Sequence, residues 1–221
     1  MLTEYPKRSE TSGSTDRLMR TYVRAKVVVF HKTKDEFGGL SNMAAGFDLR
    51  VNNVSILTAE ALYQACRFPH CPGIQQEIID QRSPMTAKMK SKANRKETRA
   101  DWEQVRSKVM RWCLRVKLAQ NYEQFGQLLL STGDRPIVEL SRKDNYWGAK
   151  LTNNSGDILI GQNVLGRLLM ELREKLKADD GRFLRSALPI DIPEFHLLGK
   201  PIEMVAAEPE SSDNQIQNAL F

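Results

Sequence analysis

The stretch WEQVRSKVMRWCLRV, residues 102–116, carries the clearest helical pattern in the chain. Apolar residues recur in it at the three- and four-residue spacing that places them on one face of an α-helix. Basic residues occupy a different face. The apolar positions are Val105, Val109, Trp112, Cys113 and Val116, and the basic positions are Lys108, Arg111 and Arg115. This stretch therefore predicts a long helix with one face in the hydrophobic core and another that is basic.

Further helices and a few strands are predicted on both sides of this helix. Helical patterns cover residues 58–68, 74–81, a segment that begins at Ser83-Pro84, 122–130 and 165–176. Strand patterns cover residues 26–30 and 136–140, and residues 47–57 predict a hairpin with Asn52-Asn53 at its turn. Because helices outnumber strands, we expect an α+β fold, a mostly helical single domain around a small β-sheet or hairpin.

Length and composition set the domain organisation. The 221 residues, 41% hydrophobic and 27% charged, suit one globular domain, which we place at residues 18–205. Polar segments at residues 1–17 and 206–221 are expected to be disordered. No apolar run approaches the roughly 20 residues of a membrane span, and no secretory signal is evident. With only three cysteines, we expect a cytoplasmic protein with no membrane contact.

The positive charge is concentrated in one region. Lys and Arg number 33 against 27 Asp and Glu, and the excess lies largely between Lys88 and Arg115. Such a region suits an anionic partner such as a nucleotide or nucleic acid. A basic surface that serves only solubility has the same composition, so charge alone does not decide between them.

Two carboxylates are candidates for chemistry, and each also has an ordinary explanation. Glu60 falls in the first turn of the helix predicted from Thr58, where an acid favours the positive end of the helix dipole. Asp144 precedes Asn-Tyr-Trp-Gly, where an aspartate commonly forms a turn. Residue chemistry alone leaves both interpretations open.

Aromatic residues beside glycines are candidates for binding a base. Phe37 adjoins Gly38, Trp147 adjoins Gly148, and Trp102 opens the basic helix. Aromatic side chains at such positions can stack on a nucleobase, or they can simply pack beneath a loop.

Other common site motifs are weak or missing in this sequence. Residues 161–166, GQNVLG, resemble a phosphate-binding turn but lack the dinucleotide-binding glycine spacing, and no strong strand precedes them. Cys66, His70 and Cys71 crowd together without a second pair at zinc spacing, so we expect no metal site. The absence of nucleophile-elbow, zincin and P-loop motifs counts against serine hydrolases, zincins and NTPases.

Several segments in a fixed order resemble the NADAR family of YbiA-like proteins. They are FGGLSNMA (37–44), AEALYQA (59–65), SPM (83–85), Arg99 with Trp102, Val138-Glu139, DNYWG (144–148) and GQNVLGRLLMELR (161–173). The family often has Glu-His-Tyr or Glu-His-Phe where this chain has Glu60-Ala61-Leu62. No role for a histidine can therefore be transferred to this position.

The resemblance implies an enzyme without a cofactor that hydrolyses an N-glycosidic bond to ribose. One branch of the family removes ADP-ribose from guanine bases in DNA and so reverses a DarT-like toxin. Another cleaves reactive ribosylated intermediates of riboflavin biosynthesis. Residues 61–70, 110–121 and 197–202 are more similar to the toxin-linked branch, so we expect ADP-ribosylated DNA as substrate, with a DarT-like toxin as functional partner. The alternatives are the riboflavin intermediate, a non-catalytic sensor of ADP-ribose or NAD, and a purely structural basic DNA-binding protein.

The resemblance and the chemistry of the bond together assign expected roles. Cleavage builds positive charge at the anomeric carbon, so Glu60 is expected to stabilise that charge or deprotonate water. Asp144 is expected to hold a ribose hydroxyl or act as a second acid or base. Lys108, Arg111 and Arg115 are expected to follow the backbone of single-stranded DNA or of DNA with a flipped base. The residues expected to bind substrate are Phe37, Gly38, Ser41, Asn42, Gln64, Lys88, Arg99, Trp102, Trp147, Gly148, Asn163 and Gly166.

Overall fold

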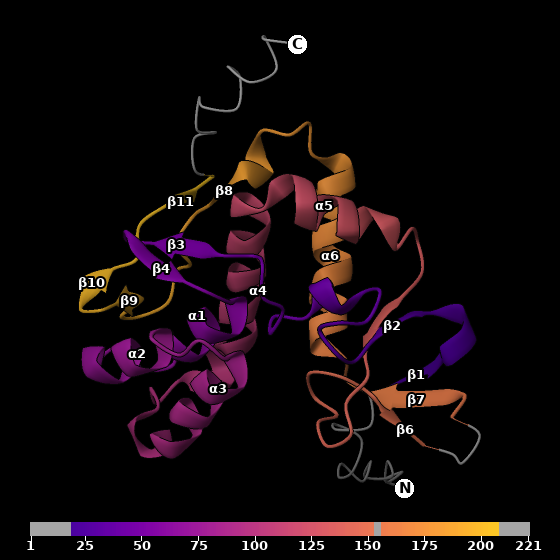
Figure 1. The fold of residues 1–221 in the computed structure, drawn as a ribbon, viewed down its shortest axis with the longest axis horizontal. Helices are drawn as coiled ribbons and strands as arrows, with labels where there is room; N and C mark the ends of the chain where they lie inside the picture. Colours follow the sequence, from indigo (N-terminus) through magenta and orange to yellow (C-terminus); the bar gives the residue numbers. More distant parts are fainter. Residues whose placement is uncertain (1–18, 153–155, 208–221) are drawn as a thin grey trace, which may run out of the picture.

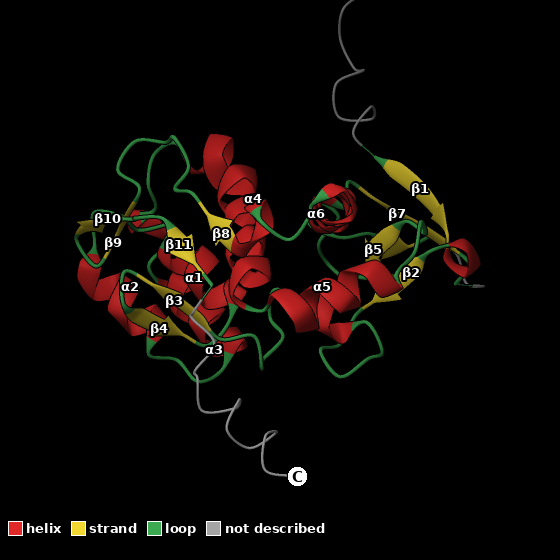
Figure 2. Ribbon diagram, turned by 90° about the horizontal axis from the view of Figure 1, so that it is seen from above, coloured by secondary structure: helices red, strands yellow, loops and turns green. Residues whose placement is uncertain are grey.

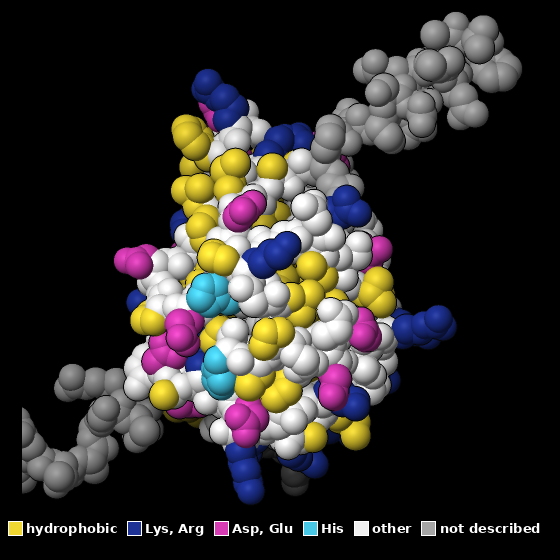
Figure 3. All heavy atoms as spheres, turned by 90° about the vertical axis from the view of Figure 1, so that its left-hand side faces the viewer, with side chains coloured by type: hydrophobic (Ala, Val, Ile, Leu, Met, Phe, Trp, Pro, Cys, Tyr) yellow, Lys and Arg dark blue, Asp and Glu magenta, His cyan; other side chains and the backbone are white. Residues whose placement is uncertain are grey.

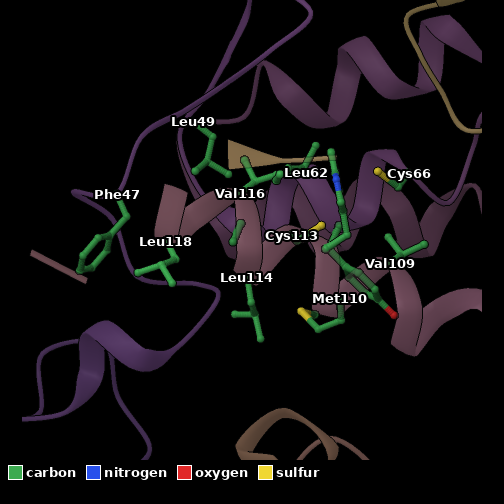
Figure 4. Close-up of a cluster of buried hydrophobic side chains, with 14 of the residues drawn as sticks. Phe47, Leu49, Leu62, Cys66, Val109, Met110, Cys113, Leu114, Val116 and Leu118 are labelled. Carbon is green, nitrogen blue, oxygen red and sulfur yellow. The ribbon is translucent and has the colours of Figure 1, made fainter. Parts of the chain in front are cut away.

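A long central helix, α4 (Trp102–Gln120), organises the computed structural model, which describes residues 19–152 and 156–207. All five apolar positions predicted for its inner face are buried. Helices α1, α5 and α6 contact it from different sides (Figure 1). Figure 4 shows part of the resulting core, where Leu62 of α1 and Leu49 of the hairpin lie close to side chains of α4. The amphipathic pattern of residues 102–116 thus predicted the centre of the fold.

Three shorter helices and a hairpin pack on one side of α4. Their bounds are α1 Ala59–Ala65, α2 Pro72–Ile79, α3 Pro84–Ala93, β3 Leu49–Val51 and β4 Val54–Ile56. The Thr58 hydroxyl accepts a hydrogen bond from the amide of Ala61 at 3.2 Å, which caps α1 as predicted. Asn52 and Asn53 join β3 to β4 with φ values of 49° and 63°. A two-residue hairpin turn of the type that follows strand twist requires positive φ at both positions, and asparagine tolerates it.

On the other side of α4 lie two helices and five strands of the described chain. The bounds are α5 Tyr122–Ser131, α6 Val164–Ala178, β1 Arg20–Val23, β2 Val28–Phe30, β5 Ile137–Glu139, β6 Lys150–Leu151 and β7 Ile158–Gly161. Figure 2 shows α6 between α4 and these strands. Strand β7 pairs antiparallel with both β1 and β6, whereas β2 pairs parallel with β5 in the register Val28 to Ile137. Helices α1 to α5 lie between these two strands in sequence, and the parallel pairing brings the ends of both strands to one edge.

The C-terminal part of the described chain forms small strand pairs against α4 and the hairpin region. They are β8 (Ser186–Ala187) with β11 (Val205–Ala206) and β9 (His196–Leu197) with β10 (Lys200–Pro201). Four single turns of 3-10 helix complete the elements of residues 19–152 and 156–207: η2 Arg24–Lys26, η3 Gly38–Leu40, η4 Arg95–Glu97 and η5 Phe183–Arg185.

The structure confirms the type of most predicted helices and strands, whereas several of their boundaries differ from the prediction. The mostly helical α+β domain and the predicted helices are confirmed. The strand expected at residues 26–30 begins only at Val28, because residues 24–26 form a 3-10 turn. The helix expected to reach residue 68 ends at Ala65. The statement that no strong strand precedes residue 161 is wrong, because β7 ends there.

The predicted disordered ends lie almost wholly outside the described residues. Residues 206 and 207 are the exception: Ala206 belongs to β11, and the amide of Ala207 donates to the carbonyl of Arg185 at 2.8 Å. The folded part therefore extends past the expected boundary at residue 205. Within residues 19–152 and 156–207, every helix is too short or too polar to cross a bilayer.

Candidate active site

Glu60 lies in the first turn of α1 with only 3% of its surface exposed. Its carboxylate accepts hydrogen bonds from the side-chain amides of Asn42 and Gln64, the latter at 2.8 Å. Lys88 of α3 places its ammonium nitrogen 4.0 Å from the same carboxylate. The backbone amide of Glu60 donates to the carbonyl of Asn42 at 2.8 Å. A buried carboxylate is costly unless donors surround it, and this one has donors from three segments of the chain.

The loop that presents Asn42 is held from inside the protein by Lys117 of α4. The ammonium group of this fully buried lysine donates to the carbonyls of Gly39 at 2.6 Å and Ser41 at 3.0 Å. It also lies 4.1 Å from the ring centroid of Phe47. Burial lowers the pKa of Lys117 to about 7. The lysine therefore fixes the position of Asn42, and through it that of the Glu60 carboxylate.

Glu60 lines a cavity, and a second carboxylate, Glu139 at the end of strand β5, lines the same cavity. Burial raises its pKa to about 7, and the negative charges of Asp144 and Glu60 act in the same direction against the opposing charge of Lys88. A carboxyl group that titrates near neutral pH can both give and take a proton under ordinary conditions. Glu139 therefore has the property required of a general acid or base.

Asp144 forms a turn and also lines the cavity. One oxygen of its carboxylate accepts hydrogen bonds from the amides of Tyr146 at 2.8 Å and Trp147 at 2.9 Å. Its own amide donates to the hydroxyl of Ser141 at 3.0 Å. These bonds make it a turn former, and the same side chain also lines the cavity.

Three aromatic side chains form a wall of the cavity, whose volume is about 230 Å³. Tyr63 packs against Trp102 with ring centroids 5.0 Å apart and against Trp147 at 5.6 Å. Burial, followed by the charge of Glu60, raises the pKa of the Tyr63 hydroxyl well above its ordinary value. The phenol therefore stays protonated at neutral pH, so the wall combines flat apolar faces with a hydroxyl group.

Basic side chains also line the cavity, one of them against the aromatic wall. Arg67 lies over the Trp102 ring at 5.4 Å, and Arg95 of η4 is nearby in the lining. Arg106 of α4 lies over the Tyr146 ring at 3.7 Å. Its buried Nε has no hydrogen-bond partner among the residues that the structure describes. Another nitrogen of the same guanidinium pairs with Glu103 at 3.1 Å, so the buried Nε is left as a donor suited to an anionic ligand group.

The structure brings together only part of the site expected from the sequence. Seven expected residues line the cavity: Asn42, Glu60, Gln64, Lys88, Trp102, Asp144 and Trp147. Seven further lining residues have side chains suited to chemistry or binding and were not identified as site residues: Tyr63, Arg67, Arg95, Glu103, Arg106, Glu139 and Ser141. For Glu139, the available signal was an acid at the end of a buried strand.

Several expected substrate-binding residues lie behind the cavity and support its walls. Asn163 donates to the carbonyl of Ile137 at 2.8 Å and accepts from the amide of Glu139 at 3.2 Å. A Cβ on Gly166 would lie 2.1 Å from the same carbonyl, and one on Gly148 would lie 2.4 Å from that of Glu139. These residues allow α6 and the 144–148 loop to approach β5 closely, which positions Glu139.

Other expected residues lie elsewhere. Gly38 and Ser41 belong to the loop behind Asn42, where a Cβ on Gly38 would lie 2.4 Å from backbone atoms of Thr33. Phe37 is partly buried and packs against the hydrophobic core. Arg99 binds Asp101 at 2.5 Å and the carbonyl of Pro193 at 2.6 Å, outside the cavity lining.

The basic face of α4 is also remote from this cavity. Lys108, Arg111 and Arg115 line a separate hollow of about 520 Å³ between α4 and α6. Arg111 pairs with Glu171 at 3.1 Å, and Arg115 donates to the carbonyl of Ser186 at 2.9 Å. Part of this positive charge is therefore engaged within the protein.

Comparison with known proteins identifies the class of protein to which this fold and site belong. The NADAR domain matches residues 29–177, and the chain belongs to this family. The NMR structure of the Escherichia coli protein YbiA has the same fold, with a TM-score of 0.56 and 35% identity over 70% of this chain and 90% of that one.

The named relatives include enzymes that act on N-glycosyl compounds. The N-glycosidase YbiA of Escherichia coli strain K12 is 37% identical over 150 residues, covering 68% of this chain and 88% of the relative. An N-glycosidase of Nostoc punctiforme is 28% identical over 152 residues, covering 68% and 92%. A riboflavin biosynthesis protein of Vibrio vulnificus is 31% identical over 159 residues, covering 72% of this chain and 41% of that protein. The expectation of a hydrolase that acts on N-glycosyl compounds is confirmed at the level of the family.

Proposed function

We propose that this chain hydrolyses the N-glycosidic bond between a planar base and a ribose that carries phosphate on its 5′ side. The observation that carries the proposal is the pairing of two carboxyl groups in one cavity. Glu60 is buried among hydrogen-bond donors, whereas burial holds the pKa of Glu139 near 7. Glycoside cleavage commonly divides its work between two such groups, one acting as a carboxylate and the other as a proton donor.

The reaction can be written with these two groups. As the carbon–nitrogen bond breaks, the Glu60 carboxylate stabilises the positive charge on the ribose and accepts a proton from the attacking water. Glu139 gives its proton to the departing nitrogen. A carbon–oxygen bond replaces the carbon–nitrogen bond, the base leaves with the proton of Glu139, and exchange with solvent resets both carboxyl groups. Asp144 keeps the role of holding a ribose hydroxyl.

The remaining lining residues form an aromatic region for the base of the substrate and a cationic region for its phosphate groups. Trp102, Trp147 and Tyr63 provide faces on which a base can stack. Arg67, Arg95 and Arg106 provide the positive charge and donors that bind phosphate or pyrophosphate. The unpartnered Nε of Arg106 is the most direct indication of an anionic group in this region.

Within this substrate class, we propose ADP-ribose attached to guanine in DNA, with removal of the modification reversing a DarT-like toxin. The similarity of residues 61–70, 110–121 and 197–202 to that branch, and the positive net charge of +6, support this substrate. The cavity volume of about 230 Å³ is too small for a duplex, so the modified base must be single-stranded or flipped out. Lys108, Arg111 and Arg115 would then contact the DNA backbone away from the cavity.

A second candidate substrate is a ribosylated aminopyrimidine intermediate of riboflavin biosynthesis. The relationship to a riboflavin biosynthesis protein of Vibrio vulnificus favours it. Its single phosphate and small base have the same chemistry as the proposed substrate class, so the catalytic roles of Glu60 and Glu139 would be unchanged.

Product release from the two substrates tests these proposals directly. The purified full chain is incubated separately with an oligonucleotide that carries ADP-ribosylated guanine and with the ribosylated aminopyrimidine phosphate. Chromatography then measures release of base and sugar phosphate. We expect release from the oligonucleotide by the wild type and by the surface control Glu203→Gln, and none by Glu60→Gln. Release only from the aminopyrimidine would overturn the proposal of DNA as substrate but would support the proposed N-glycosidase activity.

Two further outcomes separate the non-catalytic alternatives. Binding of ADP-ribose without release of product from either substrate would identify a sensor and contradict the proposed hydrolysis. Equal affinity for modified and unmodified DNA without product release would identify a structural DNA-binding protein.

Charge reversal at Lys108, Arg111 and Arg115 should weaken cleavage of modified DNA and reduce its salt dependence. Unchanged cleavage and salt dependence would remove the proposed backbone contact.

A further inference from the structure

The fold brings together three potential metal ligands from two separate segments of the chain, none of which lines the cavity of the carboxyl pair. His70 and Cys71 lie between α1 and α2, and Glu97 ends the turn η4. One ligand atom from each side chain, a ring nitrogen, the thiol sulfur and a carboxylate oxygen, lies within 4.8 Å of the other two. Sequence spacing showed only the histidine and the cysteines, because η4 lies more than twenty residues further along the chain.

Backbone hydrogen bonds hold the two segments next to each other. The amide of Cys71 donates to the carbonyl of Phe68 at 3.0 Å, which fixes the turn that follows α1. The amide of Arg99, just after η4, donates to the carbonyl of Arg67 at 3.1 Å. The ligand atoms are therefore close because the backbone is folded that way, and not through a chance contact of long side chains.

All three side chains are available to a ligand. Among the residues that the structure describes, none of the three is engaged in a side-chain hydrogen bond or an ion pair. His70 and Glu97 are exposed and Cys71 is partly buried, whereas Cys66 and Cys113 lie in the core. Figure 3 looks onto the side of the molecule that carries α2 and β9, where histidine side chains lie among acidic and hydrophobic ones. An ion could reach the site from solvent without opening the fold.

We propose that His70, Cys71 and Glu97 bind one zinc ion, with water in the fourth position. Sulfur, imidazole nitrogen and carboxylate oxygen are the ligand types that zinc accepts, usually in tetrahedral geometry. Zinc–ligand bonds of about 2.0–2.3 Å place neighbouring ligand atoms roughly 3.3–3.8 Å apart. The ligand atoms lie within 4.8 Å of one another, and rotation of the exposed His70 and Glu97 side chains can bring them to this shorter spacing. The Cys71 thiol loses its proton to solvent on binding.

A bound zinc ion would connect the two segments that carry part of the cationic lining. Arg67 lies just before the metal ligands of one segment, and Arg95 begins the turn that ends in Glu97. The guanidinium of Arg67 also donates to the hydroxyl of Thr98 at 2.8 Å. The ion would therefore hold Arg67 and Arg95 in fixed positions for a phosphate group. This consequence rests on the proposed function, whereas the binding of zinc does not.

Metal titration of the reduced, metal-free full chain tests the site. Zinc is titrated in competition with a chromophoric chelator, and cobalt(II) is used as a spectroscopic probe. We expect one ion per chain and, with cobalt, a thiolate-to-metal charge-transfer band that Cys71→Ser abolishes. His70→Ala and Glu97→Gln should each weaken zinc binding roughly tenfold or more. His196→Ala is the matched control, because it removes another histidine from outside the cluster.

The outcomes decide the proposal without reference to catalysis. No binding near stoichiometric zinc, or equal weakening by His196→Ala, would overturn the site. Loss of folding in Cys71→Ser is checked by far-ultraviolet circular dichroism, and His70→Ala and Glu97→Gln provide the same test on exposed side chains. If the chain cleaves either substrate, zinc should lower KM without changing kcat in the wild type and leave Cys71→Ser unaffected. Binding of zinc without this change in KM would overturn only the effect on the cationic lining.

Discussion

Replacing Glu139 by glutamine should stabilise the protein at high pH while impairing its chemistry. Burial raises the pKa of Glu139 from 4.5 to about 7, which means that the folded state disfavours the ionised form. Such a group contributes no penalty below pH 4.5, and stability is lost as the pH rises through 7. The shift of about 2.5 units corresponds to roughly 3 kcal/mol above pH 7, since each unit is worth about 1.4 kcal/mol. At pH 5 the same relation leaves less than about 1 kcal/mol.

Glutamine cannot ionise, so Glu139→Gln removes this penalty. Urea unfolding followed by tryptophan fluorescence measures the free energy of unfolding of both proteins at pH 5 and pH 8. The advantage of the variant should grow by about 2 kcal/mol between these two pH values. The exposed control Glu203→Gln should show no such growth. A pH-independent difference, or a variant that becomes relatively less stable at pH 8, would refute the inferred burial of the Glu139 charge.

The remaining predictions concern catalysis and the support of Glu60. Glu60→Gln should lower kcat roughly 10²- to 10⁴-fold with folding retained, measured by product release and circular dichroism. With Glu139 as the proposed proton donor, kcat should fall as the pH rises above about 7, and Glu139→Gln should lose this limb of the pH profile. Arg106→Met should raise KM about tenfold with little change in kcat, since it removes a donor for the anionic part of the substrate. For Lys117, whose pKa burial lowers to about 7, the wild type should gain stability over Lys117→Met as the pH rises from 7 toward 10, measured by urea unfolding.

Each of these predictions has a result that contradicts it. Turnover unchanged by Glu60→Gln would remove that residue from the catalytic step. A rate that rises above pH 7 would make Glu139 a base and reverse its assigned role. An unchanged KM in Arg106→Met would place the phosphate elsewhere, and a constant stability difference for Lys117→Met would show that the lysine charge is not penalised by burial.

Local sequence determined the helices and the hairpin of this protein. The apolar spacing of residues 102–116 was enough to identify α4, because a helix repeats its buried face over many residues. The Asn52-Asn53 pair identified the hairpin, because few residues accept positive φ. Strands of two to four residues contain too few positions to establish an alternating pattern, so β1, β6, β7 and the strands from β8 to β11 were missed. The equally short β2 and β5 were predicted because they lie within longer strand-like runs, residues 26–30 and 136–140.

Residue identity also indicated much of the candidate site, although not the role of every residue. Glu60, Asn42 and Gln64 meet at one carboxylate, as their places in the family pattern suggested. Arg99 and Asn163 were expected to bind substrate, yet both bind other parts of the protein. A polar residue in a sequence pattern has the same appearance whether it contacts a ligand or the backbone, and only its neighbours in space distinguish the two.

Tertiary structure alone decided which charges face each other. Parallel pairing of β2 with β5 brings Glu139 to the cavity that contains Glu60, although 79 residues, the difference between 139 and 60, separate them in sequence. The packing of α4 against the 37–42 loop buries Lys117, which otherwise would be an unremarkable basic residue of a basic helix. Periodicity reports only on residues within one element. The pKa of a carboxyl or an ammonium group depends instead on burial and on charges a few ångströms away, and these arise when separate elements pack together.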